Sequence, residues 1–289
     1  MFESLGIEVN KAVRGLFRRP GYSAICVLIL AIGIGAVTVM YSALRGVVLE
    51  PLPYPEPDRL VWAWAVTHEG QDNSVSALDY FDYRRECDSF SSLAAYLLWR
   101  PGRVLTGAGE PERVVSTSVS HNFFTTLGVE PLRGRSFLPE EAVFEGPDVV
   151  ALSHALWQRR FGGDPGIIGS AISIDGAPHD VVAVMPEKFA FPSGVEMWLP
   201  MKRGGRQESG RGNNNFFVFG RLRDSVTMAQ AQDQMSVVAR TISTTYPDSK
   251  RGWGVRLESM HETLFGEVRP LMLLLMGATG LLLLIACAN

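Results

Sequence analysis

The stretch PGYSAICVLILAIGIGAVTVMYSAL, residues 20–44, contains no charged side chain and lies between Arg19 and Arg45. As an α-helix rising about 1.5 Å per residue it would extend roughly 37 Å, which exceeds the roughly 30 Å hydrocarbon core of a bilayer. A second uncharged stretch, PLMLLLMGATGLLLLIACAN, occupies residues 270–289. We therefore predict transmembrane helix 1 over 20–44 and the start of transmembrane helix 2 over 270–289. A cleaved signal peptide is the weaker alternative for the first stretch, because its apolar core exceeds the roughly 7–15 residues of a signal sequence.

The chain between these two stretches, residues 45–269, has the composition of a folded domain. It carries 23 of the 27 basic residues and 28 of the 30 acidic residues of the whole chain. With a net charge of −3 and a pI of about 6.0, the composition gives no electrostatic reason to expect nucleic-acid binding. Three cysteines are too few for a disulfide framework.

The first nineteen residues predict a cytoplasmic amphipathic helix, because apolar residues recur at steps of three and four. Four basic residues precede the first apolar stretch, Lys11, Arg14, Arg18 and Arg19, whereas Arg45 alone follows it before Glu50. The excess of basic residues on cytoplasmic flanks then places the N-terminus in the cytoplasm and the large domain outside. A helix of this kind lies on lipid headgroups, so the bilayer is an expected partner.

The outer domain is predicted to be α+β. The alternation in residues 60–66 is typical of a strand, and Ser76, Ser153 and Thr227 stand at positions that favour helix starts. Further strands are expected at 93–99, 113–119, 148–152, 216–222 and 253–258, with a helix at 121–127 and a hairpin over 171–184 that turns at Asp175-Gly176. The segment PLPYPEPDRL, with prolines on alternate positions from Pro51 to Pro57, predicts an extended, stiff connection directly after the first apolar stretch.

No catalytic constellation is recognisable, and we predict no catalytic, cofactor-binding or metal-binding residues. The chain has no phosphate-binding G-x-x-x-x-G-K-[ST] loop, no G-x-S-x-G elbow and no H-E-x-x-H motif. The five histidines are spread along the sequence, at His68, His121, His154, His179 and His261. We therefore expect a protein that is not an enzyme and that carries no cofactor of its own.

Several charged or nucleophilic residues outside the apolar stretches are candidate site residues. Cys87 lies between Glu86 and Asp88, whose charges should raise the pKa of its thiol rather than activate it. The pairs Glu140-Glu141 and Asp79-Asp82 are interpreted as loop and helix-surface charges. The basic group Lys202, Arg203, Arg206 and Arg211 is interpreted as a solvated loop, with an anion site as the alternative.

Blocks spread over nearly the whole chain carry a family resemblance. The first is RGLFRRPGYSAICVLILAIGIGAVTVMYSALRGVVLEPLPYPEPDRLV at 14–61. It is followed by SALDYFDYR at 76–84, SVSHNFFTTLGVEPLRGRSFLPEE at 118–141, VVALSHALWQRRFGGDPGIIG at 149–169, ISIDGAPHDVVAVMPEKFAFP at 172–192, EMWLP at 196–200, GRLRDSVTMAQAQ at 220–232 and LLLLIACAN at 281–289. In this order the blocks resemble MacB-like, FtsX-like ABC transporter permeases, and within them the duplicated permease group of acidobacteria.

The resemblance implies a permease subunit of the bacterial inner membrane. Residues 45–269 would form a MacB-like periplasmic core domain, with a porter-like lobe and a second lobe inserted at about 118–212. Residues 270–289 would begin an FtsX-like permease domain. The family mechanism is mechanotransmission: a separate P-loop ABC ATPase, which binds ATP and Mg²⁺, moves the spans and through them the outer domains, for efflux or export.

The resemblance also implies partners and a longer chain. A second permease half or a homodimer is expected, and a periplasmic adaptor is a further partner that the resemblance allows. Family members continue into more spans, so we expect the sequence ending at Asn289 to be a fragment. The alternative from another class is a two-span membrane sensor with an extracytoplasmic ligand-binding domain. The two functions diverge after the second span, where a sensor would enter a signalling module.

Overall fold

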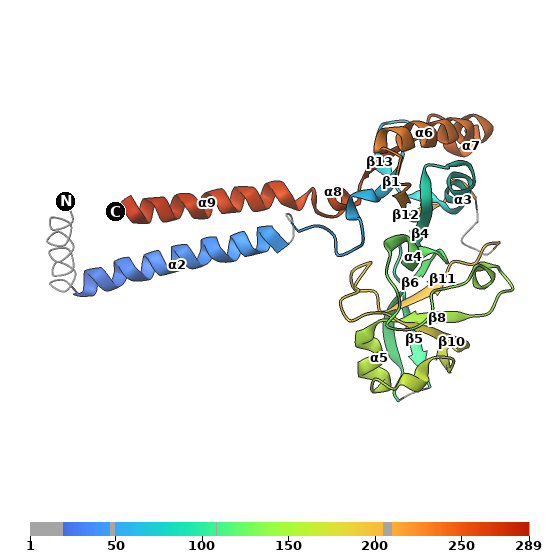
Figure 1. The fold of residues 1–289 in the computed structure, drawn as a ribbon, viewed down its shortest axis with the longest axis horizontal. Coiled ribbons are helices and arrows are strands. Elements are labelled where there is room, and N and C mark those ends of the chain that lie inside the picture. Colours follow the sequence, from blue (N-terminus) through green and yellow to red (C-terminus); the bar gives the residue numbers. More distant parts are fainter. Residues whose placement is uncertain (1–19, 47–49, 108, 205–209, 289) are drawn as a thin grey trace. The chain divides into compact units, whose positions relative to one another are not determined.

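A computed structural model describes residues 20–46, 50–107, 109–204 and 210–288 of the chain (Figure 1). The predicted amphipathic helix over 1–19 lies outside these ranges. The described residues form two compact units, one containing the long apolar helices and one spanning Pro53–His261. The predicted fold class, an α+β domain flanked by two apolar helices, is confirmed.

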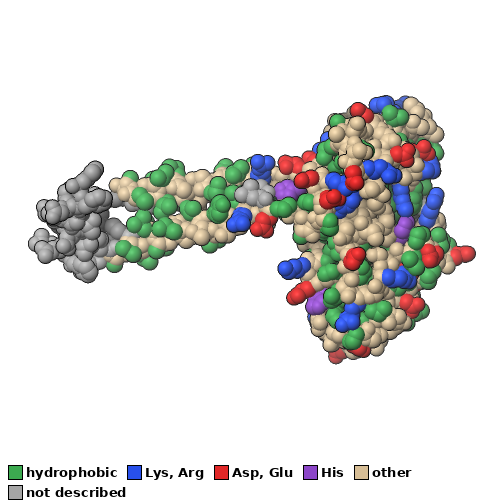
Figure 2. Space-filling view, in the orientation of Figure 1, with side chains coloured by type: hydrophobic (Ala, Val, Ile, Leu, Met, Phe, Trp, Pro, Cys, Tyr) green, Lys and Arg blue, Asp and Glu red, His purple; other side chains and the backbone are tan. Residues whose placement is uncertain are grey.

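The first unit consists mainly of helices α2 (Pro20–Leu44) and α9 (Val268–Ala288), which lie side by side. Their most apolar windows, Val27–Leu44 and Val268–Ile285, have mean hydropathies of 2.3 and 2.1. Large apolar side chains point outward along both helices, as Figure 2 shows; Val39, for example, is 70% exposed. Both helices are therefore long and apolar enough to cross a membrane, where such side chains would meet lipid instead of water.

The second unit, Pro53–His261, carries the strands and most of the shorter helices. Its strands are β1 (Leu60–Val66), β2 (Asp72–Asn73), β3 (Val75–Ser76), β4 (Phe90–Leu97), β5 (Gly102–Thr106), β6 (Glu112–Val119), β7 (Arg133–Gly134), β8 (Val149–Leu152), β9 (Ala171–Ile174), β10 (Ala177–Val184), β11 (Met197–Pro200), β12 (Asn214–Leu222) and β13 (Gly254–Ser259). Its helices are α3 (Ala77–Glu86), α4 (Phe123–Leu127), α5 (His154–Phe161), α6 (Met228–Thr245) and α7 (Pro247–Lys250), with 3-10 turns η2 (Pro57–Arg59), η3 (Pro139–Ala142) and η4 (Pro165–Ile167). Helix α8 (Met260–Phe265) follows β13.

An antiparallel sheet with the order β4-β12-β1-β13 forms the first core. Strand β1 alternates as its sequence predicts: Val61, Ala63 and Ala65 face a core that also contains the buried sides of α3 and α6. The opposite face of the sheet carries Trp62, whose ring packs 5.3 Å from that of Phe217. This face is therefore covered by aromatic side chains, and α4 contributes Phe123 to them.

The second core lies inside a closed ring of strands, β6-β5-β9-β10-β8-β11, because β11 pairs with both β8 and β6. The pairs β10–β8 and β11–β6 are parallel. Leu105 and Val114, on strands that begin before Ser118, belong to this second core. The boundary of the inserted lobe at about 118–212 stays a prediction.

The proline-rich connection is bent and is bound to the outer domain. Glu56 has a left-handed backbone (φ 46°), and a 3-10 turn follows at once, so the segment is not extended throughout as predicted. Arg221 of β12 donates one hydrogen bond to the Pro55 carbonyl (2.7 Å) and another to the Thr126 carbonyl of α4 (3.1 Å). Arg59 of η2 donates to the Leu222 carbonyl (2.9 Å). These long-range hydrogen bonds override the local preference of the prolines.

Candidate functional site

Helix α3 positions both groups of charged side chains that could form a functional site. It begins where predicted, with the Ser76 hydroxyl accepting a hydrogen bond from the Asp79 backbone N–H (3.1 Å). Because residues four apart share one side of a helix, Asp79 lies with Tyr83, and Tyr80 lies with Arg84. Asp79 and Tyr83 face one side of α3 and Tyr80 and Arg84 another, so the two pairs lie in different surroundings.

Asp79 enters a buried ionic cluster, which we define as Asp79, Asp82, Arg211 and Lys250. The Arg211 guanidinium spans both carboxylates, at 2.7 Å from Asp79 and 2.6 Å from Asp82. The Lys250 ammonium lies 2.7 Å from the second Asp79 oxygen and 2.6 Å from the Asn214 side-chain oxygen. Asp79 and Lys250 are almost fully buried, so the interpretation of Asp79 as a surface charge is wrong.

Aromatic rings enclose this buried ionic cluster. The Arg211 guanidinium lies 3.8 Å from the centre of the Tyr246 ring, and the Lys250 ammonium lies 4.4 Å from that of Trp253. Burial lowers the pKa of Lys250, although the Asp79 carboxylate opposes this effect. The cluster is thus compensated in charge and connects α3, the segment before β12 and α7.

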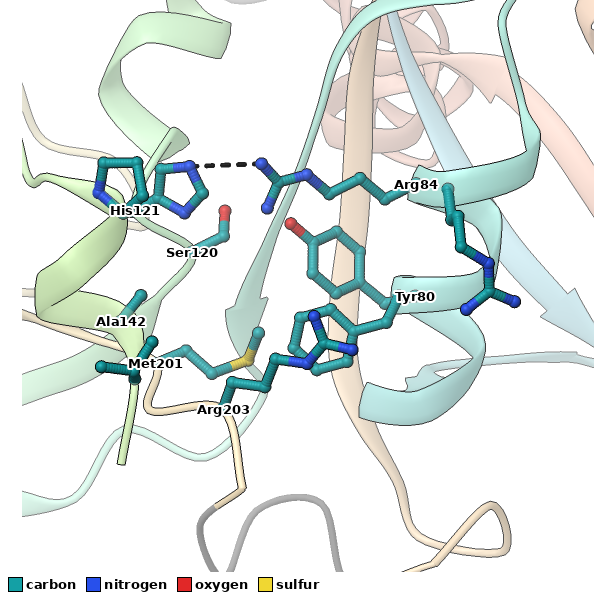
Figure 3. A pocket seen from close by; sticks show the side chains of 11 residues that line it. Tyr80, Arg84, Ser120, His121, Ala142, Met201 and Arg203 are labelled. Atoms are coloured by element: carbon teal, nitrogen blue, oxygen red, sulfur yellow. Dashed lines mark hydrogen bonds between the residues drawn. The ribbon is translucent and has the colours of Figure 1, made fainter. Parts of the chain in front are cut away.

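Tyr80 and Arg84 enter a pocket of about 380 Å³, which we call the arginine pocket. Its lining comes from α3, from the segment after β6, from η3 and from the segment after β11, and consists of Tyr80, Phe81, Arg84, Arg85, Ser120, His121, Pro139, Ala142, Val143, Met201 and Arg203. Figure 3 shows the Arg84 guanidinium beside the His121 ring at one side and the Arg203 guanidinium at the other. The Tyr80 and Ser120 hydroxyls lie near each other beside the Arg84 guanidinium.

The contact between Arg84 and His121 fixes the state of the histidine. The Arg84 Nη2 atom lies 3.2 Å from His121 Nε2, and a guanidinium can only donate. His121 therefore accepts at Nε2 and, when neutral, carries its proton on Nδ1. Burial lowers the pKa of His121, the Arg84 charge lowers it further, and Glu140 opposes both.

Arg203 lies at the opposite side of the arginine pocket, where a backbone hydrogen bond and an aromatic ring fix its position. Its N–H donates to the Ala142 carbonyl (2.7 Å), and its guanidinium lies 4.9 Å from the centre of the Phe81 ring. The neighbouring Lys202 instead donates to the Gly146 and Pro147 carbonyls, each at 2.7 Å. The basic group predicted as one solvated loop is thus divided: Arg211 is buried, Lys202 binds backbone, Arg203 lines the pocket and Arg206 lies outside the described residues.

The other candidate site residues do not lie together. Glu141 is buried and binds Arg135 (2.6 Å) and the Leu138 N–H (2.7 Å), so it is structural rather than a loop-surface charge. Burial, with the charges of Asp88 and Glu86, raises the pKa of Cys87 to about 12, in the direction predicted. Within the ranges that the structure describes, no three His, Cys, Asp or Glu side chains are grouped so that they could hold a metal ion.

Sequence reasoning missed Tyr80, Arg84 and Ser120. The signal available was the spacing of Tyr80 and Arg84 on α3, but nothing local indicates that Arg203 lies across a pocket from them. That proximity depends on the pairing of distant strands.

Comparisons with known proteins agree on the outer domain. The model of the family described as "MacB-like periplasmic core domain" matches residues 23–238. Among solved structures, a domain of a putative permease protein from Porphyromonas gingivalis is 15% identical, with a TM-score of 0.54, covering 72% of this chain and 92% of that one. The periplasmic region of MacB from Actinobacillus actinomycetemcomitans is 11% identical, with a TM-score of 0.53 and coverages of 79% and 97%.

A third solved structure is similar over a shorter stretch. The extracellular domain of the noncanonic ABC-type transporter YknZ from Gram-positive bacteria is 14% identical, with a TM-score of 0.49 and coverages of 68% and 99%. No curated protein matches the chain in sequence. The likenesses to the permease domain and to the MacB periplasmic region, at these identities, support the fold alone, and the family match carries the identification.

Proposed function

The chain belongs to the family of MacB-like periplasmic core domains, and from this we propose that it is a non-catalytic permease subunit of an ABC transporter of the MacB/FtsX type. The observation that carries the proposal is the family match over residues 23–238, which includes most of α2 and most of the outer domain. Helices α2 and α9, each long and apolar enough to cross the inner membrane, flank that domain in sequence.

The proposed mechanism is mechanotransmission for efflux or export. ATP and Mg²⁺ would be bound by a separate P-loop ATPase on the cytoplasmic side, and a second permease half or a homodimer would complete the transporter. The connection after α2 supports the proposal, because Arg221 and Arg59 attach it to β12 and α4 by hydrogen bonds. A segment bound in this way can pass a displacement of the helix into the sheet.

Orientation is the first property to test. We expect Trp99→Cys, at a position that is 71% exposed on the outer domain, to react with a membrane-impermeant maleimide in intact spheroplasts. Lys11→Cys should react only after lysis, since the N-terminus is proposed to be cytoplasmic. The unsubstituted chain supplies the background, and its Cys87 should contribute little because its thiol is buried and its pKa is raised. The opposite labelling pattern would contradict the proposed topology.

The partner is tested by crosslinking the chain in its native membrane and identifying what copurifies. A P-loop ATPase is expected. Trapping that ATPase with ATP and vanadate should change the labelling rate of Trp99→Cys, and an ATPase lacking its P-loop lysine should not. Copurification of a kinase or receptor module instead would support the sensor alternative and overturn the permease proposal.

A further inference from the structure

The arginine pocket has an unbalanced charge. Of its three arginines, only Arg85 is neutralised, by Asp82 and Glu86, each at 2.7 Å. Arg84 and Arg203 are both exposed, and neither forms an ion pair with any described residue. The two guanidiniums lie on either side of one cavity (Figure 3). Like charges held around a common space favour the entry of an anion.

We propose that the arginine pocket binds a small organic anion in which a phosphate or carboxylate group is attached to a compact apolar body. The oxyanion lies between Arg84 and Arg203, since planar guanidiniums donate paired hydrogen bonds to such groups. The inference goes beyond the proposed permease function, because it concerns binding by the outer domain whether or not the ligand is transported.

The floor of the pocket supplies polar groups for the oxyanion. The Ser120 hydroxyl accepts the Ala95 N–H (3.0 Å) and is hydrogen-bonded to the Tyr80 side chain. Tyr80 is fully buried and donates to the Leu93 carbonyl (3.1 Å), so its position is fixed. His121, whose Nε2 accepts from Arg84, has an Nδ1–H when neutral. The donors left for an oxyanion are therefore the two guanidiniums and the His121 Nδ1–H, while Ser120 and Tyr80 hold each other in place.

The rest of the lining accounts for the apolar body. Phe81 and the buried Met201 lie among the lining residues, together with Pro139, Ala142 and Val143 of the η3 segment. A volume of about 380 Å³ lies near the lower end of the roughly 300–1,000 Å³ of small-molecule sites. Inorganic phosphate alone would leave this apolar wall uncovered, so the body should add affinity.

Binding would also act on the arrangement of the domain. Arg84 belongs to α3, whereas Arg203 follows β11 and is hydrogen-bonded to the end of η3. Without a ligand these two cations repel each other across the pocket. An anion between them removes that repulsion and attaches α3 to the η3 segment.

The test is isothermal titration calorimetry on the full chain in dodecyl maltoside, with phenyl phosphate, benzoate, inorganic phosphate and phenol as probes. Phenyl phosphate or benzoate should bind, and the tighter of the two identifies the oxyanion as a phosphate or a carboxylate. Inorganic phosphate and phenol should each bind at least about 10-fold more weakly, because one lacks the apolar body and the other the charge.

Two substitutions locate the binding. Arg84→Gln and Arg203→Gln should each weaken the tighter probe about 10-fold or more, the usual effect of losing a charge-assisted hydrogen bond. The matched control is Arg240→Gln, an exposed arginine of α6 outside the pocket, which should change affinity less than about 2-fold. Because these side chains are exposed, their variants should fold, and tryptophan fluorescence of the outer domain verifies this.

Three results would overturn the proposal. One is the absence of binding by both organic anions at about 10 mM, where a weak small-molecule site would already be occupied. Another is unchanged affinity in the Arg84→Gln/Arg203→Gln double variant, which would locate any binding elsewhere. The third is phenol binding as tightly as phenyl phosphate. None of these results depends on the ATPase or on membrane orientation, so failure here is distinguishable from failure of the permease proposal.

Discussion

The buried ionic cluster and the arginine pocket both include residues of helix α3, but they differ in charge balance: the cations of the cluster are paired with carboxylates, and two cations of the pocket are not, within the described ranges. In the cluster each cation has a carboxylate within 2.7 Å, and two of the four side chains are almost fully buried. In the pocket two arginines are exposed and have no carboxylate partner among the described residues. One short helix of ten residues therefore carries a balanced group and an unbalanced group.

The difference separates stability from binding. A buried charge is costly unless it is paired, so the cluster must be complete for the domain to fold well. An exposed arginine contributes little to stability, so an excess of positive charge around a cavity is tolerated without being required by the fold. Substitutions in the two regions should accordingly differ in which property they change.

The largest effect is expected for Asp79→Asn. This substitution replaces the buried Asp79 carboxylate, which both Lys250 and Arg211 bind, with a neutral amide. Breaking a buried ion pair costs about 3–5 kcal/mol. For a domain of this size that corresponds to a melting temperature lower by about 6–20 °C. Tryptophan fluorescence during heating measures this melting temperature, because all six tryptophans lie in the outer domain.

The matched control for Asp79→Asn is Asp233→Asn, an exposed position on α6. Its melting temperature should stay within about 2 °C of the unsubstituted chain. Equal shifts in the two variants would show that the buried ionic cluster does not stabilise the domain.

A smaller effect is expected for Arg211→Lys, which keeps the charge. Lysine cannot bridge Asp79 and Asp82 with a planar fork, nor stack on Tyr246 as a guanidinium does. We expect a loss of about 1–2 kcal/mol, or about 2–8 °C in melting temperature. Arg84→Lys in the arginine pocket should leave the melting temperature within about 2 °C. A larger shift for Arg84→Lys than for Arg211→Lys would reverse the comparison.

What the sequence predicted correctly is local. The caps at Ser76, Ser153 and Thr227 form as expected, each hydroxyl accepting an N–H three residues on. The hairpin turns at Asp175-Gly176, where both residues have a positive φ. These features depend on neighbours within four residues, so the residue types alone determine them.

What the sequence could not predict depends on distant partners. The ring of strands closes through pairing of β11 with β6, about 80 residues earlier. The ion pair between Arg211 and Asp79 joins residues 132 apart in sequence, so the sequence around Asp79 predicts only a helix-surface charge. In the same way the sequence does not predict that Arg203 and Arg84 line one cavity, because nothing in the residues around either one indicates the other.

The smallest expected effect concerns pH and His121, the one histidine of the arginine pocket. Burial and the Arg84 charge lower the pKa of His121 in the folded chain, against the opposing charge of Glu140. The unfolded chain, with a histidine pKa of about 6.5, therefore takes up a proton at a higher pH than the folded chain does. This contribution to stability is present above about pH 6.5 and is lost as the pH falls toward the folded pKa.

Melting temperatures measured from pH 7.5 to pH 5 test this contribution. The melting temperature of His121→Gln should decline less over this range than that of the unsubstituted chain. Arg84→Gln should reduce the decline only in part, since burial is the larger cause. A decline in His121→Gln as steep as in the unsubstituted chain would assign the pH dependence to groups outside the arginine pocket.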